Sequence, residues 1–260
     1  MSRIEIDDQA LPLTRGQLDI WLAQQTGHPG TEWQLGILMR IEGTVEPCLL
    51  EQAIRQVVHE AEPLRAAFFE MDGQVFQRVI DDPGIKLEFY DLSSSRDPVQ
   101  EAHEMASSIQ RTPMPFTGPL INFSLFRTRP DEYYWFTCWH HIILDGLGIS
   151  LIGRRIAAVY SAIVSGKPAS PAFFGSLQDL VGGELEYEAS SDYIDDQAYW
   201  TRNLPSESGP DYGWPEATDG DSYWPSTPVQ LDPSVVGQIK GLSKVLGVRR
   251  FSLITAACAL

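Results

Sequence analysis

The segment that most limits the fold of this chain is an aromatic strand pattern that runs, through a short connection, into an amphipathic helix pattern. Residues 133–140 read Tyr-Tyr-Trp-Phe-Thr-Cys-Trp-His, a composition typical of a β-strand. Residues 149–164 repeat apolar side chains at the spacing of one helix face. The connection runs only from His141 to Gly148. A strand that leads so directly into a helix indicates a fold of the mixed α/β class.

Two adjacent histidines, His140 and His141, stand at the end of this strand. Successive side chains of a strand point to opposite faces, so His140 shares a face with Cys138 while His141 shares the other face with Trp139. The two rings therefore cannot have the same role. We expect one ring to be buried structure and the other to face a cavity.

The remaining chain also alternates between strand and helix patterns. Strands are predicted at 34–42, 64–70, 75–80, 86–90, 120–127 and 229–231, and helices at 46–61, 97–111, 175–188, 193–203, 234–246 and 251–260. A first helix begins after Thr14, whose side chain is suited to cap it. Residues 205–228 are rich in Pro, Gly, Ser and acidic residues, and we interpret them as a linker or crossover.

The charge and cysteine content argue against several classes of protein. The chain has 19 Lys and Arg against 35 Asp and Glu, a formal charge of −16, which disfavours nucleic acid and anionic membrane surfaces as partners. Its three cysteines are far apart and form no CxxC pair, so a disulfide framework or zinc ribbon is not expected. No uncharged apolar stretch reaches the length of a membrane span. We expect a cytoplasmic protein.

Three interpretations of the histidine segment follow from the residues alone. The simplest is a buried histidine beside Asp145, an aspartate that caps a helix. A metal site would need a third ligand, and no other histidine has a fitting spacing, so no metal is expected. A nucleophilic pair of Cys138 and His140 on one face is conceivable, although a cysteine buried among aromatic residues behaves as a small hydrophobic side chain.

The complete string His140-His141-x-x-x-Asp145-Gly146, placed after a strand, resembles the HHxxxDG signature of nonribosomal peptide synthetase condensation domains. These domains belong to the superfamily with the chloramphenicol acetyltransferase-like fold. The glycine after the aspartate also permits a tight bend from the strand into the helix.

Other segments resemble further motifs of the same family, in the same order. Residues 13–21 resemble the first motif, SxAQxRLW, with Gln17 and Trp21 in place but Gly16 instead of alanine and no second arginine. Residues 62–68 resemble the second motif, RHExLRTxF, and include its arginine as Arg65. Ala61 and Ala66 stand where that motif has histidine and threonine. Residues 174–179 and 199–204 resemble the weaker fourth motif and the helix after it.

The resemblance implies an α/β fold, an α+β two-layer sandwich that forms the first of two lobes arranged in a V. Residues 1–175 are expected to be this N-terminal lobe and 176–204 its connecting helices. Residues 205–228 are then the crossover, and 229–260 the start of a truncated C-terminal lobe. The chain is expected to be a fragment of a longer polypeptide and catalytically poor alone, because the second lobe supplies the far wall of the substrate tunnel.

The resemblance also implies amide formation between two thioesters presented on 4'-phosphopantetheine arms, with no cofactor bound by the domain itself. The partners are a donor acyl or peptidyl carrier protein, an acceptor peptidyl carrier domain and a downstream adenylation domain. His141 is the expected catalytic residue, acting as a general base or orienting the amine. His140 and Asp145 are structural, Asp145 pairs with Arg65, and Gly146 offers its N–H to the developing oxyanion.

The start of the sequence suggests the donor. Because the first motif begins about a dozen residues after Met1, we expect the first domain of its polypeptide, which takes its donor in trans or accepts a fatty acyl starter, as in lipopeptide or siderophore synthesis. Two alternatives stay open: a related acyltransferase that forms an ester or uses coenzyme A, and a degenerate docking domain without activity.

Overall fold

A computed structural model of the chain describes residues 10–26, 31–204 and 231–258. It divides into two compact units, Met1–Asn203 and Leu204–Leu260, each described by itself below. The predicted linker at 205–228 lies outside the described residues.

A four-stranded sheet organises the first unit. Its strands are β2 (Gln34–Glu42), β7 (Glu132–His140), β6 (Ile121–Arg129) and β5 (Leu87–Asp91), hydrogen-bonded in that order. The pairs β2–β7 and β7–β6 are antiparallel, whereas β5 is parallel to β6. The aromatic strand β7 is thus central, and its last residue, His140, lies opposite Gln34 of β2.

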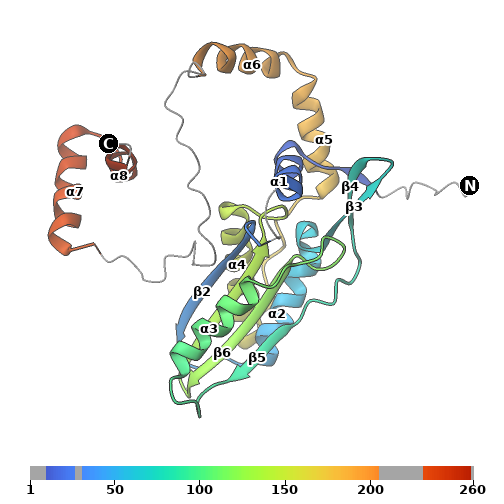
Figure 1. Ribbon diagram of the computed structural model, residues 1–260. Helices are drawn as coiled ribbons and strands as arrows, with labels where there is room; N and C mark the ends of the chain where they lie inside the picture. The colour runs from blue at the N-terminus through green and yellow to red at the C-terminus, as the bar shows by residue number, and fades with distance from the viewer. Residues whose placement is uncertain (1–9, 27–30, 205–230, 259–260) are drawn as a thin grey trace, which may run out of the picture. The chain divides into compact units, whose positions relative to one another are not determined.

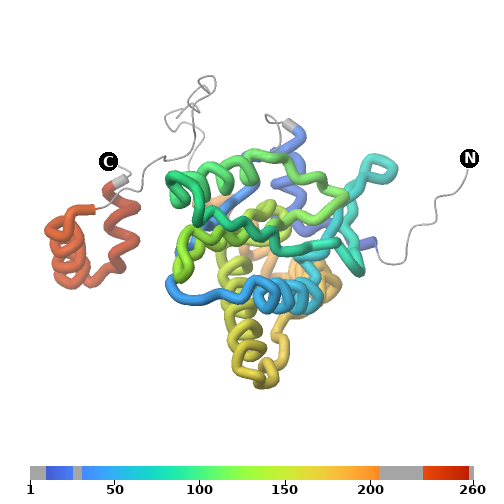
Figure 2. Tube along the Cα trace, turned by 90° about the horizontal axis from the view of Figure 1, so that it is seen from below, coloured from blue at the N-terminus to red at the C-terminus, as the bar shows by residue number. Residues whose placement is uncertain are grey.

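Helices cover both faces of this sheet (Figures 1 and 2). Helix α3 (Pro98–Gln110) lies on one face, where Gln110 approaches Gly36 and Phe136. Helices α2 (Pro47–Glu60) and α4 (Gly146–Val164) pack side by side on the other. Every residue of β7 except Tyr134 is consequently buried, as expected for a central strand with both faces covered.

A smaller sheet adjoins helix α1 (Arg15–Thr26). It contains β1 (Leu11–Pro12), β4 (Gln74–Val79) and β3 (Ala66–Met71), and the short helix η1 (Glu62–Arg65) precedes β3. Thr14 caps α1 as predicted, because its Oγ1 accepts the N–H of Gln17 and the Gln17 side chain accepts the N–H of Thr14. This reciprocal pair is a capping box.

An ion pair joins α4 to α2. Arg155, buried in the middle of α4, donates from Nε and Nη2 to the carboxylate of Glu60, at 2.7 and 2.8 Å. In the described residues, α4 is also the helix long and apolar enough to cross a membrane. Its face with Ile152 and Ile156 is buried against the sheet and α2, and its arginine is paired, as in the core helix of a globular domain.

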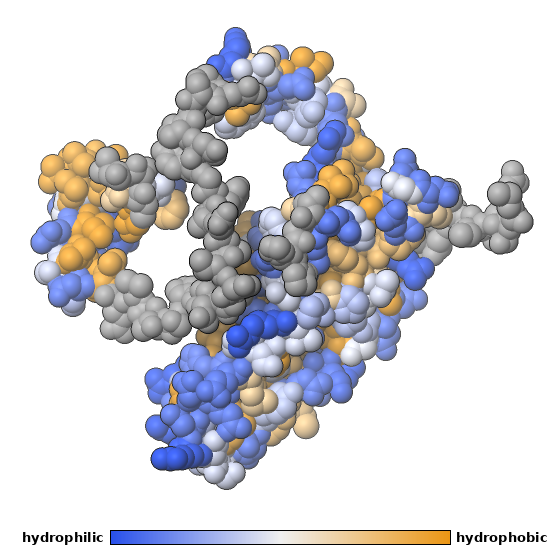
Figure 3. All heavy atoms as spheres, in the orientation of Figure 1, coloured by the Kyte–Doolittle hydropathy of each residue, from blue (hydrophilic) through white to orange (hydrophobic). Residues whose placement is uncertain are grey.

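The remaining helices carry many exposed apolar side chains. In the first unit these helices are α5 (Leu177–Glu188) and α6 (Ser191–Asn203), and in the second unit α7 (Pro233–Leu246) and α8 (Arg250–Cys258). Figure 3 shows apolar residues gathered over α7 and α8, where Val245 and Phe251 are among the most exposed.

Except for the strand at 229–231, the strands and helices predicted from the sequence are present in the described residues, with ends displaced by a few residues. Of the strand predicted at 229–231, only Leu231 is described, and it is not in a strand.

Candidate active site

The two histidines lie where β7 ends and the chain turns toward α4. His140 is the last strand residue, and His141, Ile142 and Ile143 form a turn. Asp145 then caps α4, which begins at Gly146. The strand and the helix thus fix the turn at both ends.

His140 is fully buried on the α3 face of the sheet. Its Nδ1 accepts the backbone N–H of Ile142 at 3.2 Å, so the ring hydrogen lies on Nε2, which donates to Oε1 of Gln24 at 2.7 Å. The ring of Phe116 lies edge-on at 5.1 Å between centroids. Burial, followed by the nearby charge of His141, lowers the pKa of His140 to about 4. The ring is therefore neutral at pH 7 and holds the turn.

His141 is only half-buried. Its backbone N–H donates to the carbonyl of Trp33 at 2.7 Å, which extends the β2–β7 ladder by one residue. The strand alternation therefore continues to His141, which shares the face of Thr137 and Trp139. The ring of Trp33 lies edge-on to the imidazole at 6.2 Å. Of the two histidines, His141 is the one that a substrate can reach.

Three side chains, two from β7 and one from α1, hold the backbone of the turn. Besides the bond from Ile142 N–H to His140, Gln17 of α1 donates to the carbonyl of Ile142 at 3.3 Å. Trp139 donates from Nε1 to the carbonyl of Leu144 at 3.0 Å. Gln17 was identified from the sequence only as part of a motif, because its contact with Ile142 spans 125 residues. The contact of Trp139 spans only five residues, but it depends on the path of the turn, which the sequence pattern does not give.

The expected ion pair between Asp145 and Arg65 is wrong. Asp145 is exposed, and its Oδ1 accepts the N–H of Gly148 at 2.7 Å as the N-cap of α4. Arg65 donates instead to three backbone carbonyls, those of Val58 and His59 in the last turn of α2 and that of Ile80. Each group satisfies the free backbone groups of a different helix end, which explains both residues without a mutual contact.

The expectation that Gly146 permits a tight bend is also not met. Its φ is not positive, and a Cβ added there would meet nothing within 4 Å. Any residue could adopt this backbone. What distinguishes Gly146 is its place in the first turn of α4, where backbone N–H groups lack acceptors within the helix.

The sequence left two other interpretations of this segment, a nucleophilic cysteine and a metal site. Cys138 is fully buried, and burial raises the pKa of its thiol to about 12, so a thiolate nucleophile is disfavoured. Within residues 10–26, 31–204 and 231–258, no group of three or more His, Cys, Asp or Glu side chains could hold a metal ion.

An apolar groove of about 560 Å³ runs along α4, and Gly146, the first residue of the helix, is part of its lining. We call it the α4 groove. The sheet supplies one wall and α4 the other, and the lining residues are Ile37, Met39, Ile41, Phe123, Trp135, Thr137, Gly146, Ile149, Ser150, Ile152, Gly153, Arg154, Ile156 and Ala157. Thr137 and Trp135 share the face of His141, so the groove and the accessible histidine lie on the same side of the sheet.

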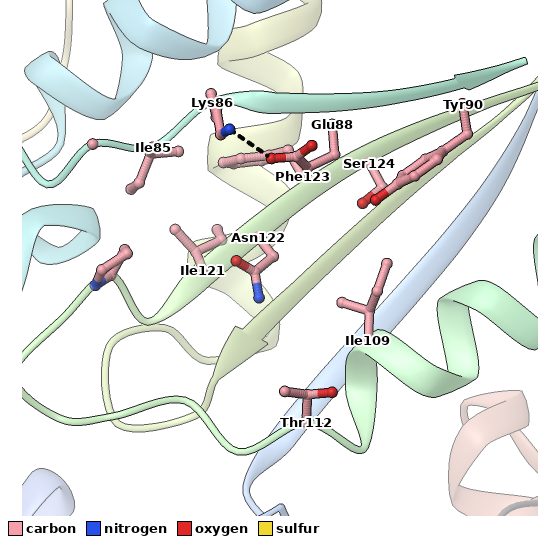
Figure 4. A pocket seen from close by; sticks show the side chains of 12 residues that line it. Ile85, Lys86, Glu88, Tyr90, Ile109, Thr112, Ile121, Asn122, Phe123 and Ser124 are labelled. Carbon is pink, nitrogen blue, oxygen red and sulfur yellow. Dashed lines mark ion pairs between the residues drawn. The ribbon is translucent and has the colours of Figure 1, made fainter.

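A second hollow, of about 300 Å³, lies between β5, β6 and the end of α3 (Figure 4). Lys86 and Glu88 form an ion pair at its rim at 3.2 Å, and Ile109 and Thr112 face it from the α3 side. The residues that line it from the end of α3 place it on the side of the sheet opposite to His141, so we do not assign it to the site.

Comparisons with known proteins agree on the family. The family model of the condensation domain matches residues 7–259. A dimodular nonribosomal peptide synthase of Bacillus subtilis (strain 168) is 35 % identical over 195 residues, which are 74 % of this chain and 8 % of that protein.

Solved structures show the same likeness. The starter condensation domain of rhizomide synthetase RzmA has a TM-score of 0.71 at 33 % identity, over 76 % of this chain and 48 % of that one. A mutant of that domain in complex with C8-CoA gives 0.72 at 33 % identity, over 75 % and 45 %. The chain therefore spans about half the length of these solved domains and a small part of the curated synthase.

The capping bond of Asp145 gives a first prediction. Asp145→Ala should lower the free energy of unfolding by about 1 kcal/mol, the usual cost of losing an N-cap, as measured by urea denaturation. Asp145→Ser, which can still cap the helix, should retain most of that stability. A loss of several kcal/mol from Asp145→Ala would instead indicate a buried ion pair of the kind expected from the sequence.

The neutral state of His140 gives a second prediction, on pH. In the unfolded chain this residue takes up a proton near pH 6.5, but in the folded protein only near pH 4. The unfolded state therefore binds more protons between these values, and the free energy of unfolding falls as the pH is lowered through this window.

Between about pH 7.5 and pH 5.5, wild type should lose about 1 kcal/mol more stability than His140→Gln, which has no ring to protonate. Urea denaturation of both proteins at the two pH values measures the difference. Parallel pH profiles would show that His140 is not held neutral by the fold.

Proposed function

The chain belongs to the condensation domain family, and from this premise we propose that it forms an amide bond between an acyl thioester donor and an aminoacyl thioester acceptor, with His141 as the catalytic residue. The observation that carries the proposal is the pair of unlike histidines. One is buried, neutral and bonded on both nitrogens, whereas its neighbour is half-buried on the side of the α4 groove.

In the reaction, one proton must leave the amine nitrogen and one must reach the departing sulfur. The amine nitrogen of the acceptor attacks the thioester carbonyl, the new C–N bond forms, and the C–S bond to the donor thiol breaks. The nitrogen must lose a proton, and the departing sulfur leaves as a thiolate that takes one up. An imidazole can accept and return that proton near neutral pH, or it can hold the amine in place as its positive charge develops.

The start of α4 offers a partner for the developing oxyanion. Gly146 lies in the first helical turn, it is exposed, and it is part of the lining of the α4 groove. The N–H groups of a first turn carry partial positive charge and lack acceptors within the helix. A carbonyl oxygen placed there would gain a donor as it becomes negative.

The substrates are presented by other domains in this proposal. Donor and acceptor arrive on 4'-phosphopantetheine arms of carrier proteins, and the acceptor amino acid is activated by an adenylation domain, so the chain itself binds no cofactor. Residues 1–175 form the first lobe and residues 229–260 begin the second. Since the chain spans about half of the solved domains, the assays below use the complete gene product.

We further propose a fatty acyl group as the donor. The α4 groove is lined mostly by apolar side chains, and its lining includes Gly146, five residues after His141, which suits an alkyl chain whose thioester stays near His141. A similar solved domain was crystallised with C8-CoA, an eight-carbon acyl thioester of coenzyme A.

Replacement of the catalytic residue tests the activity. His141→Ala should lower the rate of condensation between two loaded carriers by about 10²- to 10⁴-fold, the range for loss of a general acid–base group, followed by intact-mass detection of the product. His103→Ala, on the exposed surface of α3, serves as the matched control and should keep the wild-type rate. Wild-type rates in His141→Ala would reject this residue as catalytic.

Two neighbouring alanines of α4 test the donor site. Both alanines are exposed, but Ala157, eleven residues or about 16 Å along the helix from Gly146, lines the groove, whereas Ala158 does not. Ala157→Leu should therefore shift the preferred donor toward shorter acyl chains, and Ala158→Leu should not.

The assay compares acyl groups of increasing length, offered on a separate carrier and in parallel as coenzyme A thioesters. Equal chain-length profiles for both variants would exclude the groove as the acyl site. Turnover of coenzyme A thioesters alone would favour the coenzyme A-dependent acyltransferase instead.

A further inference from the structure

A buried glutamine of the small sheet lies at the start of a hydrogen-bond chain that ends at the active-site turn. Gln77 is fully buried on β4, the middle strand of that sheet, opposite Leu11 of β1 and Phe68 of β3. It belongs to none of the motifs recognised in the sequence. A buried primary amide has two donors and an acceptor that require partners, so its contacts are informative.

The amides of Gln77 and Gln17 bind each other reciprocally. Nε2 of Gln17 donates to Oε1 of Gln77 at 3.0 Å, and Nε2 of Gln77 donates to Oε1 of Gln17 at 2.8 Å. The second donor of Gln77 reaches the carbonyl of Pro12 at 3.0 Å, and the second donor of Gln17 reaches the carbonyl of Ile142 at 3.3 Å. All four N–H donors of the pair are thereby used.

The surroundings allow only one orientation of each amide. The carbonyls of Pro12 and Ile142 can only accept, so each must face an NH₂ group. Reversal of the Gln77 amide would set its oxygen against both the Pro12 carbonyl and the oxygen of Gln17. The pair therefore acts as a fixed link between β1, α1 and the turn.

The bond to Ile142 completes the restraint on the residue after His141. The N–H of Ile142 is held by Nδ1 of His140, and its carbonyl is held by Gln17. On the other side of His141, its own N–H is held by Trp33. The Ile142 carbonyl belongs to the peptide between Ile142 and Ile143, whose N–H donates to the carbonyl of His140 at 3.2 Å. Loss of the Gln17 bond would leave this peptide, in the turn after His141, held at its N–H only, while the strand before His141 stays in place.

We infer that Gln77 is a positioning residue, which acts through Gln17 to fix the peptide between Ile142 and Ile143, and so the turn that sets the direction of the His141 imidazole. The inference rests on the proposed catalytic role of His141. It predicts that Gln77 affects the rate constant of condensation although it touches neither substrate. Orientation of a catalytic group is sensitive to displacements of an ångström or less.

Gln77→Met tests the inference, because methionine has a similar length and volume but no strong donor. In the complete gene product its kcat should fall about tenfold while KM for the donor changes by less than about twofold. The amides of Ile142 and Ile143 should also exchange with deuterium faster than in wild type. Gln74→Met, an exposed position on the same strand, is the matched control and should change neither property.

Gln77→Glu provides the rescue. As a protonated acid it can still exchange two hydrogen bonds with Gln17, but as a carboxylate it cannot donate. Its kcat should approach that of wild type at low pH and fall toward that of Gln77→Met as the pH is raised. A merely structural side chain would not make the rate depend on this ionisation.

The outcomes separate the two proposals. If His141→Ala abolishes condensation but folded Gln77→Met keeps wild-type kcat and exchange rates, the positioning role is overturned alone. If His141→Ala is active, the catalytic assignment fails, and faster exchange at Ile142 in Gln77→Met still reports whether the pair holds the turn. Failure of both Gln77 variants to fold would also overturn the inference, because the pair would then serve the fold rather than the turn.

Discussion

Strand β7 is covered on both faces, and this burial gives the two histidines at its end different roles. With α3 on one side and α2 and α4 on the other, every side chain of the strand except that of Tyr134 is buried. A ring at its end is then either enclosed, like His140, or placed beyond the last buried position, like His141. Enclosure lowers the pKa of His140 to about 4 and makes it a neutral hydrogen-bonding group. The half-buried neighbour keeps access to a substrate.

The side-chain amides of glutamines make hydrogen bonds to backbone groups around this strand. Gln34, opposite His140, donates to the carbonyls of Gln110 and Thr112 at the end of α3 and accepts the N–H of Met114. Gln17 and Gln77 join the small sheet to the turn in a similar way. An amide both donates and accepts, so it can satisfy backbone groups in the interior without the desolvation cost of a charge. Hydrogen bonds to backbone thus replace the ion pair that the motif arginine and aspartate suggested.

The fold could be anticipated because its signals are local. Thr14 and Gln17 form a capping box, Asp97 precedes a proline at the first position of α3, and Gly73 stands in the hairpin between β3 and β4. Such caps and turns depend on neighbours within a few residues, and the apolar periodicity of α2 and α4 reports directly on burial. The contact of Arg65 with the end of α2 was not anticipated, since it depends on how a following strand is placed against a helix.

The sequence by itself determined that β7 leads into α4, that His140 and His141 occupy opposite faces, and that Asp145 caps a helix. These follow from strand alternation and helix-end chemistry, which act over a few bonds. Only the tertiary structure decided which histidine is enclosed, because burial depends on helices that pack from distant parts of the chain. It also decided that Arg65 and Asp145 lie apart, that a groove runs along α4, and that Gln77 reaches the turn through Gln17. Each of these arises where side chains separated by many residues are brought within hydrogen-bond or van der Waals distance.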